Sequence, residues 1–317
     1  VYNLKGRRDN KYKARIKILV NALGIDTFRE LVEAEWEQIK DSDLQLPAAE
    51  IERVQGFFKP FDYDQAAAND TTLDAKLTED QTFAHWYRQN TVAHKVAGYR
   101  AVVVSLKAHL KPKGDITHQQ MDLVADLADQ YSFGEIRSTH NQNLVLADVR
   151  KQDLYTLWKT LEEANLARAN INTLTDMTVC PGGDFCALAN AKTLGVADQI
   201  DAKFEDLDYL YDLGEIKLNM SGCINACSHH HIGHIGILGV DKKGEDWYQI
   251  TLGGSDGEDA SLGKVIGKAV AADQVADSLE KVLSVFVENR IEDERFIDCV
   301  RRIGLTPFKE KVYAPAH

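Results

Sequence analysis

Apolar and polar positions between residues 98 and 166 alternate in blocks that predict an ordered series of strands and helices. In chain order, they predict a strand at 99–110, a helix at 121–131, strands at 134–139 and 143–149, and a helix at 154–161. The first block is rich in β-branched residues, whereas the helical blocks place apolar residues three or four positions apart. This order indicates an α+β layer with its helices on one face of the sheet.

The pattern beyond residue 170 predicts a second region that mixes strands and helices. Residues 231–240 predict a strand, 241–244 (DKKG) a turn, and 245–254 the return strand of a hairpin. The apolar spacing within 275–286 predicts a late helix. Both regions therefore contain sheets, which agrees with an α+β protein.

The first 45 residues and the segment that follows differ from these regions. Residues 16–23 carry one apolar face and predict a helix, and residues 41–80 are polar enough to predict a linker or surface excursion. Seven cations precede residue 18: Lys5, Arg7, Arg8, Lys11, Lys13, Arg15 and Lys17. The charge pattern alone favours the solvated face of a helix, and the alternative is an anion-binding edge.

Length and composition limit the protein class. The 317 residues suit two domains with room for part of a third. No apolar run approaches the length of a membrane span and no export signal is visible, so we expect a soluble, cytoplasmic protein without a membrane partner. The net charge of -12 disfavours nucleic acid as a partner. Any bound anion must therefore meet a local basic site.

Four of the five cysteines form two tight pairs. Cys180 and Cys186 enclose a Pro-Gly-Gly turn, and Cys223 and Cys227 follow Gly222. Short loops can direct four thiolates at one centre, and glycine lets backbone N–H groups turn toward inorganic sulfide. The spacing favours a 4Fe-4S cluster.

A zinc site is the alternative, because histidines follow the second pair at 229, 230, 231 and 234. The first cysteine pair is wider than zinc ribbons use, and consecutive histidines point in different directions. For each histidine a packing role or a hydrogen bond to a ligand is favoured over metal ligation. Cys299 stands alone and is expected to be structural.

These motifs resemble the sulfite and nitrite reductases that couple siroheme to a 4Fe-4S cluster. Beyond the cysteines, the chain resembles the haem-bearing (beta) subunit of bacterial assimilatory sulfite reductase in GRRDNKYKARIKIL (6–19), EIRSTHNQNLVL (135–146), YQITLGGSDGEDASLGK (248–264) and ENRIEDERFIDCVRRIG (288–304). The resemblance implies that Cys180, Cys186, Cys223 and Cys227 hold the cluster. It also implies that Cys227 bridges to the siroheme iron as its axial thiolate.

The resemblance also suggests where the carboxylate-rich siroheme is held. The basic run at Arg7, Arg8, Lys11, Arg15 and Lys17 is the best cationic candidate, and a family loop lies against the macrocycle. By position, the cofactor contacts would be Arg8, Arg15, Lys17, Arg137, Thr139, Asn141, Gln142 and Asn143. For each loop residue, hydrogen bonding within a turn or strand edge is the competing explanation.

The resemblance implies four parts in this chain. We expect the tail of an upstream siroheme-binding domain at 1–45, a linker or excursion at 46–82, a ferredoxin-like half-domain at 83–168, and a mixed α/β domain for 4Fe-4S and siroheme at 169–317. The family carries an upstream repeat that grips the substrate. We therefore expect this chain to be a C-terminal fragment.

The implied reaction is the six-electron reduction of sulfite to sulfide in sulfur assimilation, with nitrite reduction to ammonia as the alternative. No flavin or nicotinamide fingerprint is present, so a flavoprotein reductase subunit, itself reduced by NADPH, or a ferredoxin is the expected electron donor. A zinc-stabilised binding module and a cluster-only electron carrier are the alternatives from other classes.

Overall fold

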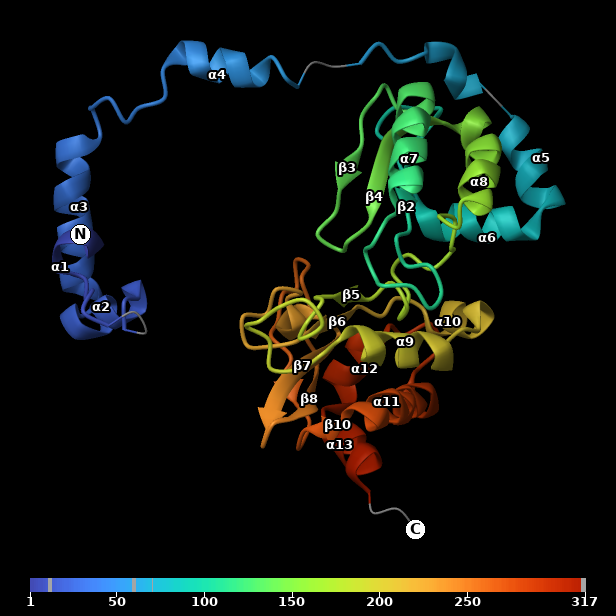
Figure 1. The fold of residues 1–317 in the computed structure, drawn as a ribbon. Helices are drawn as coiled ribbons and strands as arrows, with labels where there is room; N and C mark the ends of the chain where they lie inside the picture. Colours follow the sequence, from blue (N-terminus) through green and yellow to red (C-terminus); the bar gives the residue numbers. More distant parts are fainter. Residues whose placement is uncertain (11–12, 59–60, 70, 315–317) are drawn as a thin grey trace. The chain divides into compact units, whose positions relative to one another are not determined.

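The computed structural model describes residues 1–10, 13–58, 61–69 and 71–314. The chain divides into two compact units, residues 1–62 and 63–317 (Figure 1). The first unit contains the helices α1 (Tyr2–Lys5), α2 (Ile16–Leu23), α3 (Ile25–Ile39) and α4 (Ala48–Gln55). Among the described side chains of these helices, Leu19 alone is buried, while Trp36 is 53% exposed. The unit therefore presents apolar side chains that have no core of their own.

The segment 46–82, expected as a linker or surface excursion, contains short helices. Helix α4 belongs to the first unit, whereas a 3-10 turn at Gln65–Asn69 and helix α5 (Thr72–Glu79) belong to the second. Leu73 and Leu77 lie one helical turn apart, and they pack on the core of the second unit. A short helix with so few apolar residues gives little periodic signal, which explains why composition alone suggested a linker.

The first part of the second unit is a four-stranded antiparallel sheet in the order β1-β2-β4-β3. Its strands are β1 (Thr91–Ala93), β2 (Tyr99–Val104), β3 (Arg137–Ser138) and β4 (Leu144–Arg150). Its helices are α6 (Gln81–Asn90), α7 (His118–Tyr131) and α8 (Leu154–Glu163). Phe83, Trp86 and Trp158 are fully buried between these helices and the sheet. The strand, helix, strand, strand, helix order predicted from periodicity is present.

The strand expected to continue to residue 110 ends at Val104. Beyond it the chain folds into a loop that buries the Lys107 side chain completely. The Asn143 Oδ1 atom accepts a hydrogen bond from the Leu106 N–H at 3.1 Å, in place of a ladder partner. The apolar residues of this segment are therefore buried in a loop, which residues distant in the sequence contact.

The second part is a six-stranded mixed sheet in the order β10-β8-β7-β6-β5, with β9 beside β8. Its strands are β5 (Thr178–Val179), β6 (Leu218–Ser221), β7 (Ile235–Lys242), β8 (Glu245–Leu252), β9 (Lys264–Val265) and β10 (Val270–Ala271). Strands β5, β6 and β7 are parallel, and β7 and β8 form the predicted hairpin. Lys243 and Gly244 both have positive φ in its two-residue turn, as a type I′ turn requires.

The helices of this part are α9 (Leu194–Lys203), α10 (Leu207–Leu213), α11 (Val275–Asn289), α12 (Phe296–Ile303) and α13 (Thr306–Tyr313). Their apolar residues join those of the sheet in one core, which includes the buried Cys299. Helix α11 spans the block predicted at 275–286. Across the described part of the chain, every helix falls short of the length and apolar character needed to cross a bilayer.

Candidate functional site

The two cysteine loops leave the same edge of the parallel sheet. Cys180 follows β5 directly, and Cys223 stands two residues after β6. The two strands are neighbours with Val179 opposite Met220, and the Cys180 N–H continues the ladder to the Met220 oxygen at 3.1 Å. The carboxyl ends of adjacent parallel strands are a common place for ligand sites. The sheet therefore brings together two loops that are far apart in the sequence.

Gly222 allows the loops to pack against each other. A Cβ atom at this position would lie 2.7 Å from the Gly182 Cα and 2.8 Å from the Ala191 oxygen, so no other residue fits without movement. The Gly222 N–H donates to the Cys180 Sγ at 3.1 Å. This contact holds the backbone of the second loop against the first cysteine.

The thiols differ in exposure. Cys223 is buried, Cys180 and Cys186 are half-buried, and Cys227 is exposed. Large apolar side chains surround them on the same loops: Phe185, Leu188 and Ile224 are 82%, 73% and 80% exposed. Exposed apolar groups of this size around polar ligands are typical of a surface that another molecule covers.

Two buried polar atoms beside the cysteine loops are compatible with a cluster. Among the described residues, five buried side-chain N or O atoms have no hydrogen-bond partner; three of them belong to Trp86, Asn90 and Asp148 in the half-domain, and the other two are Ser221 Oγ and His230 Nδ1. Ser221 is the next residue after Met220 in the β5-β6 register, beside Cys180, and His230 follows Cys227 by three positions. Buried polar atoms rarely stay unpaired, and cluster sulfurs accept hydrogen bonds.

The described residues contain no group of three or more His, Cys, Asp or Glu side chains arranged to hold one ion. The preference for a cluster over zinc therefore rests on the spacing of the cysteines.

The histidines after Cys227 have individual surroundings. Burial, with a smaller effect from neighbouring His231, lowers the pKa of His230 to about 4, so its imidazole is neutral at pH 7. Burial also lowers the pKa of His234, whose Nδ1 accepts a hydrogen bond from the Lys217 N–H at 3.2 Å. His234 thus has a structural role between β6 and β7.

The loop predicted to contact the cofactor uses three of its side chains within the protein. Asn143 is buried, and its Nδ2 donates to the Asp176 Oδ1 at 2.9 Å. The Gln142 side chain makes two hydrogen bonds to the backbone of Val179. Thr139 closes the turn by accepting from the Asn143 N–H at 3.1 Å. These contacts agree with the turn and strand-edge explanation, and the role of the three residues as cofactor contacts stays a prediction.

Arg137 and Asn141 remain predictions as cofactor contacts. Arg137 is exposed and donates to the Glu135 carboxylate at 3.0 Å. The Asn141 backbone oxygen is held by Lys107, while its side chain lines a small recess that also includes Lys217.

The basic run belongs to the first unit, so its placement relative to the cysteine loops is not determined. Arg8, Arg15 and Lys17 are exposed, and the Arg8 guanidinium donates to the Asn3 side chain at 2.7 Å. Arg7 pairs with Asp9 at 2.8 Å. Lys11 lies outside the described residues. The role of this run in holding siroheme stays a prediction.

Periodicity missed two buried lysines beside the loop. The Lys107 Nζ donates to the backbone oxygens of Asn141 and Gln142 at 2.6 and 2.9 Å. Burial lowers the pKa of Lys107 to about 8, and the nearby Asp176 carboxylate opposes this shift. Lys113 is buried against Asp201 at 2.7 Å. The signal in the sequence was the run of alternating cations KAHLKPK (107–113), which a strand would not bury.

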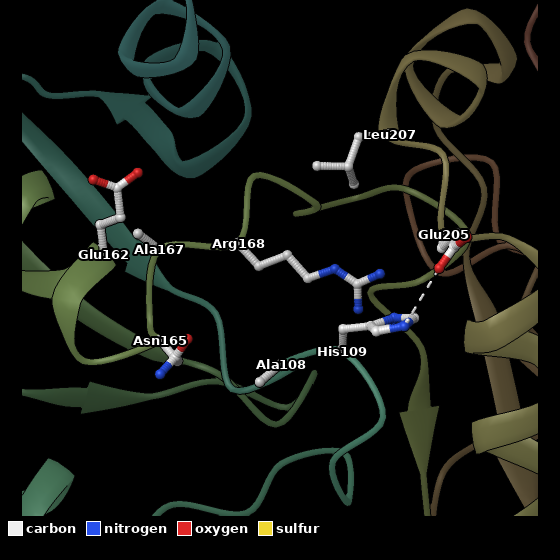
Figure 2. A pocket seen from close by; sticks show the side chains of 8 residues that line it. All are labelled: Ala108, His109, Glu162, Asn165, Ala167, Arg168, Glu205 and Leu207. Atoms are coloured by element: carbon white, nitrogen blue, oxygen red, sulfur yellow. Dashed lines mark ion pairs between the residues drawn. The ribbon is translucent and has the colours of Figure 1, made fainter.

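A cavity of about 440 Å³ lies near Asp201, where the 105–113 loop approaches the region of α9 and α10 (Figure 2). His109 and Arg168 point toward its centre, and His109 lies 3.6 Å from the Glu205 carboxylate. Arg168 Nη1 is held by Asp201 at 2.7 Å. None of the four paired cysteines lines this cavity. Arg168 pairs with Asp201, and Glu162 pairs with Lys159, which fits a structural contact between the two parts of the unit.

Comparison with known families gives two matches. The nitrite and sulphite reductase 4Fe-4S domain matches residues 1–40 and 170–317. The nitrite/sulfite reductase ferredoxin-like half domain matches residues 95–164. The second match and the four-stranded sheet confirm the predicted α+β class with a ferredoxin-like half-domain.

Individual relatives carry the names of both activities. The chain is 28% identical over 312 residues to a "Sulfite reductase [ferredoxin] 2" of Mycolicibacterium paratuberculosis, covering 95% of this chain and 49% of that protein. It is 27% identical over 304 residues to the chloroplastic "Ferredoxin--nitrite reductase" of Zea mays, covering 92% and 47%. The chain thus spans about half the length of these relatives.

Solved structures agree on the fold. The Mycobacterium tuberculosis NirA protein superposes with a TM-score of 0.64 at 26% identity, covering 96% of this chain and 50% of that one. Dissimilatory sulfite reductase I superposes with a TM-score of 0.59 at 14% identity, covering 69% and 70% of the two chains, which shows a shared fold alone.

Proposed function

The chain belongs to the nitrite and sulphite reductase family, and on that premise we propose that it serves in the reduction of sulfite to sulfide. Membership of this family implies that a 4Fe-4S cluster and siroheme are the cofactors. In this proposal Cys180, Cys186, Cys223 and Cys227 hold the cluster. The observation that carries it is the meeting of both cysteine loops at the ends of β5 and β6, with the Gly222 N–H on the Cys180 sulfur.

The chain's own residues would hold and shield the cofactors. When bound, the coupled cluster and siroheme would pass on six electrons from the donor protein, which with six protons convert sulfite to sulfide and three waters. Cys227 is the most exposed of the four cysteine residues, and we propose that it would also hold the siroheme iron, as the family resemblance implies. Phe185, Leu188 and Ile224 would exclude water around it.

Nitrite is the second candidate substrate, because relatives of both names match at nearly equal identity. The electron donor is proposed to be a ferredoxin, as in the names of these relatives, or a flavoprotein reductase. We propose a cytoplasmic location, the compartment that keeps cysteine ligands reduced.

Spectroscopy and metal analysis test the proposal together. The chain is produced in cells that make siroheme and purified without oxygen, and its iron, acid-labile sulfide, zinc and absorption spectrum are measured. We expect iron and sulfide in equal amounts and a siroheme band. Alanine at Cys180 or Cys223 should abolish the iron, whereas Cys299→Ala, the matched control in the core, should keep it.

Turnover distinguishes the substrates. Reduced methyl viologen serves as donor, and its oxidation is followed with sulfite and with nitrite, for this chain and for a protein extended to the full length of its relatives. We expect the extended protein to prefer sulfite and this chain alone to turn over weakly. Stoichiometric zinc in a colourless protein would instead support a binding module, and a brown protein without siroheme would support an electron carrier.

A further inference from the structure

We propose that Gln142 is a positioning residue for Cys180, acting as a strut between the ferredoxin-like half-domain and the first cysteine loop. The inference rests on the proposed function, because it gives Cys180 a role as cluster ligand. It concerns the side-chain amide of Gln142, which pairs with the backbone of the residue directly before Cys180.

The first step is the hydrogen bonding of Val179. The Gln142 Nε2 atom donates to the Val179 oxygen at 2.8 Å, and the Gln142 Oε1 atom accepts from the Val179 N–H at 2.8 Å. A primary amide that both donates and accepts in this way replaces the peptide group of a neighbouring strand. Val179 is therefore bonded as if another strand lay beside it.

The second step is the position of β5 at the edge of the six-stranded sheet. Strand β6 is its single neighbour within the described sheet. Successive N–H groups of a strand point to opposite sides, and the Cys180 N–H points to β6, where it meets the Met220 oxygen. The Val179 N–H consequently points to the open edge. Without Gln142 this edge would present unpaired backbone groups beside a metal ligand.

The third step is that Gln142 is itself held firmly. Its φ of 58° lies in the left-handed region, and the buried Lys107 Nζ binds its backbone oxygen at 2.9 Å. Gly114 makes room for it, since a Cβ there would lie 2.9 Å from the Gln142 Cβ. The backbone from which the Gln142 side chain leaves is therefore fixed, which gives the side-chain amide an anchored base.

The fourth step is a parallel connection through Asn143. Its Oδ1 accepts from the Leu106 N–H, and its Nδ2 donates to Asp176, two residues before β5. Residues 176–179 are thus gripped at both ends by loop 141–143. Strand β5 has only two residues, so its own ladder does little to position Cys180. The half-domain supplies the missing rigidity. A metal ligand must be held within about 0.5 Å of its productive position.

Hydrogen exchange tests the strut without any cofactor. In the unmodified chain, exchange is followed by mass spectrometry in a peptide spanning 177–180. We expect the Val179 N–H to be protected although it faces the open edge. Gln142→Met keeps the side-chain length but deletes both hydrogen bonds, and it should speed this exchange between about twofold and tenfold. The matched control is Gln130→Met on exposed α7, which should leave the peptide unchanged.

The role in positioning is tested on the cluster-loaded chain. We expect Gln142→Met to shift the EPR signal of the reduced cluster and to shorten its lifetime in air at least threefold, with the thermal unfolding midpoint matching that of Gln130→Met. Such a spectroscopic change does not follow from a loss of fold stability. An unchanged signal and lifetime would overturn the inference, as would fast exchange of Val179 in the unmodified chain.

The failure of the proposed function looks different. If the unmodified chain binds no iron and sulfide, the cluster assignment fails while the exchange data still report on the strut. If the unmodified chain holds a cluster and Gln142→Met holds it identically, the assignment stands and the positioning role of Gln142 is refuted.

Discussion

Replacing Lys107 with methionine removes a charge that the fold holds at a cost. The Lys107 side chain is fully buried, and its Nζ binds two loop oxygens while lying 3.9 Å from the Asp176 carboxylate. Burial lowers the pKa of Lys107 from 10.5 to about 8, and the attraction of Asp176 is too weak to restore it. Methionine has a similar length and no charge, so it keeps most of the packing.

The magnitude follows from linkage. A base whose pKa falls on folding destabilises the protein while it is charged, and this cost is full below pH 8 and disappears as the pH rises past 10.5. The difference between about 8 and 10.5 corresponds to about 3 kcal/mol at pH 7. About 2 kcal/mol of this should be recovered between pH 7 and pH 9.5. Groups that do not interact with Lys107 cancel in the comparison, whereas Asp176, whose pKa burial raises and Lys107 lowers, is coupled to the substitution.

Urea unfolding of the cofactor-free chain and the variant provides the assay, with tryptophan fluorescence as the signal. Trp86 and Trp158 lie buried in the half-domain core, so they report on the part that contains Lys107. We expect the unmodified chain to gain about 2 kcal/mol relative to Lys107→Met between pH 7 and pH 9.5. A stability difference that stays constant over this range would refute the claim that burial destabilises the charged lysine.

Three further predictions use the same chain. Gly114→Ala should lower the free energy of unfolding in urea by about 1–3 kcal/mol, because Gly114 has a φ of +89° and a Cβ there would meet the Gln142 side chain. The control Gly195→Ala in α9 has open space around it and should be neutral or stabilising. Equal effects of the two substitutions would contradict this prediction. Asp201→Asn should lower the free energy of unfolding by about 3–5 kcal/mol, because it breaks a fully buried ion pair. Asp277→Asn, at an exposed ion pair, should lower it by less than about 1 kcal/mol. A small loss for Asp201→Asn would mean that its charges are hydrated. Ser221→Ala should leave the cofactor-free stability nearly unchanged yet lower the midpoint potential of the bound cluster, and an unaltered potential would show that the Ser221 hydroxyl does not reach a cluster sulfur.

The sequence pattern correctly predicted the elements that depend on residues close together in the chain. The hairpin at 241–244 follows from a turn with Gly at a positive-φ position between two apolar runs, and α11 follows from helical spacing. The cysteine pairs were visible because ligand spacing is a property of neighbouring residues. The strand predicted to residue 110 failed because a loop buried by distant partners has the same apolar letters as a strand.

What the sequence by itself determined is therefore the order of elements, the four thiols and the family they resemble. The tertiary structure decided which polar groups serve those thiols. In the sequence, Gln142 is one polar residue of a predicted loop. Only the folded chain places its side-chain amide 2.8 Å from the backbone of Val179, which is 37 positions away and directly precedes Cys180. Lys107 likewise becomes a buried cation only when Asp176 comes near. The reason is physical: periodicity reports which side of an element faces the core, whereas hydrogen bonds and ion pairs depend on which distant groups meet there.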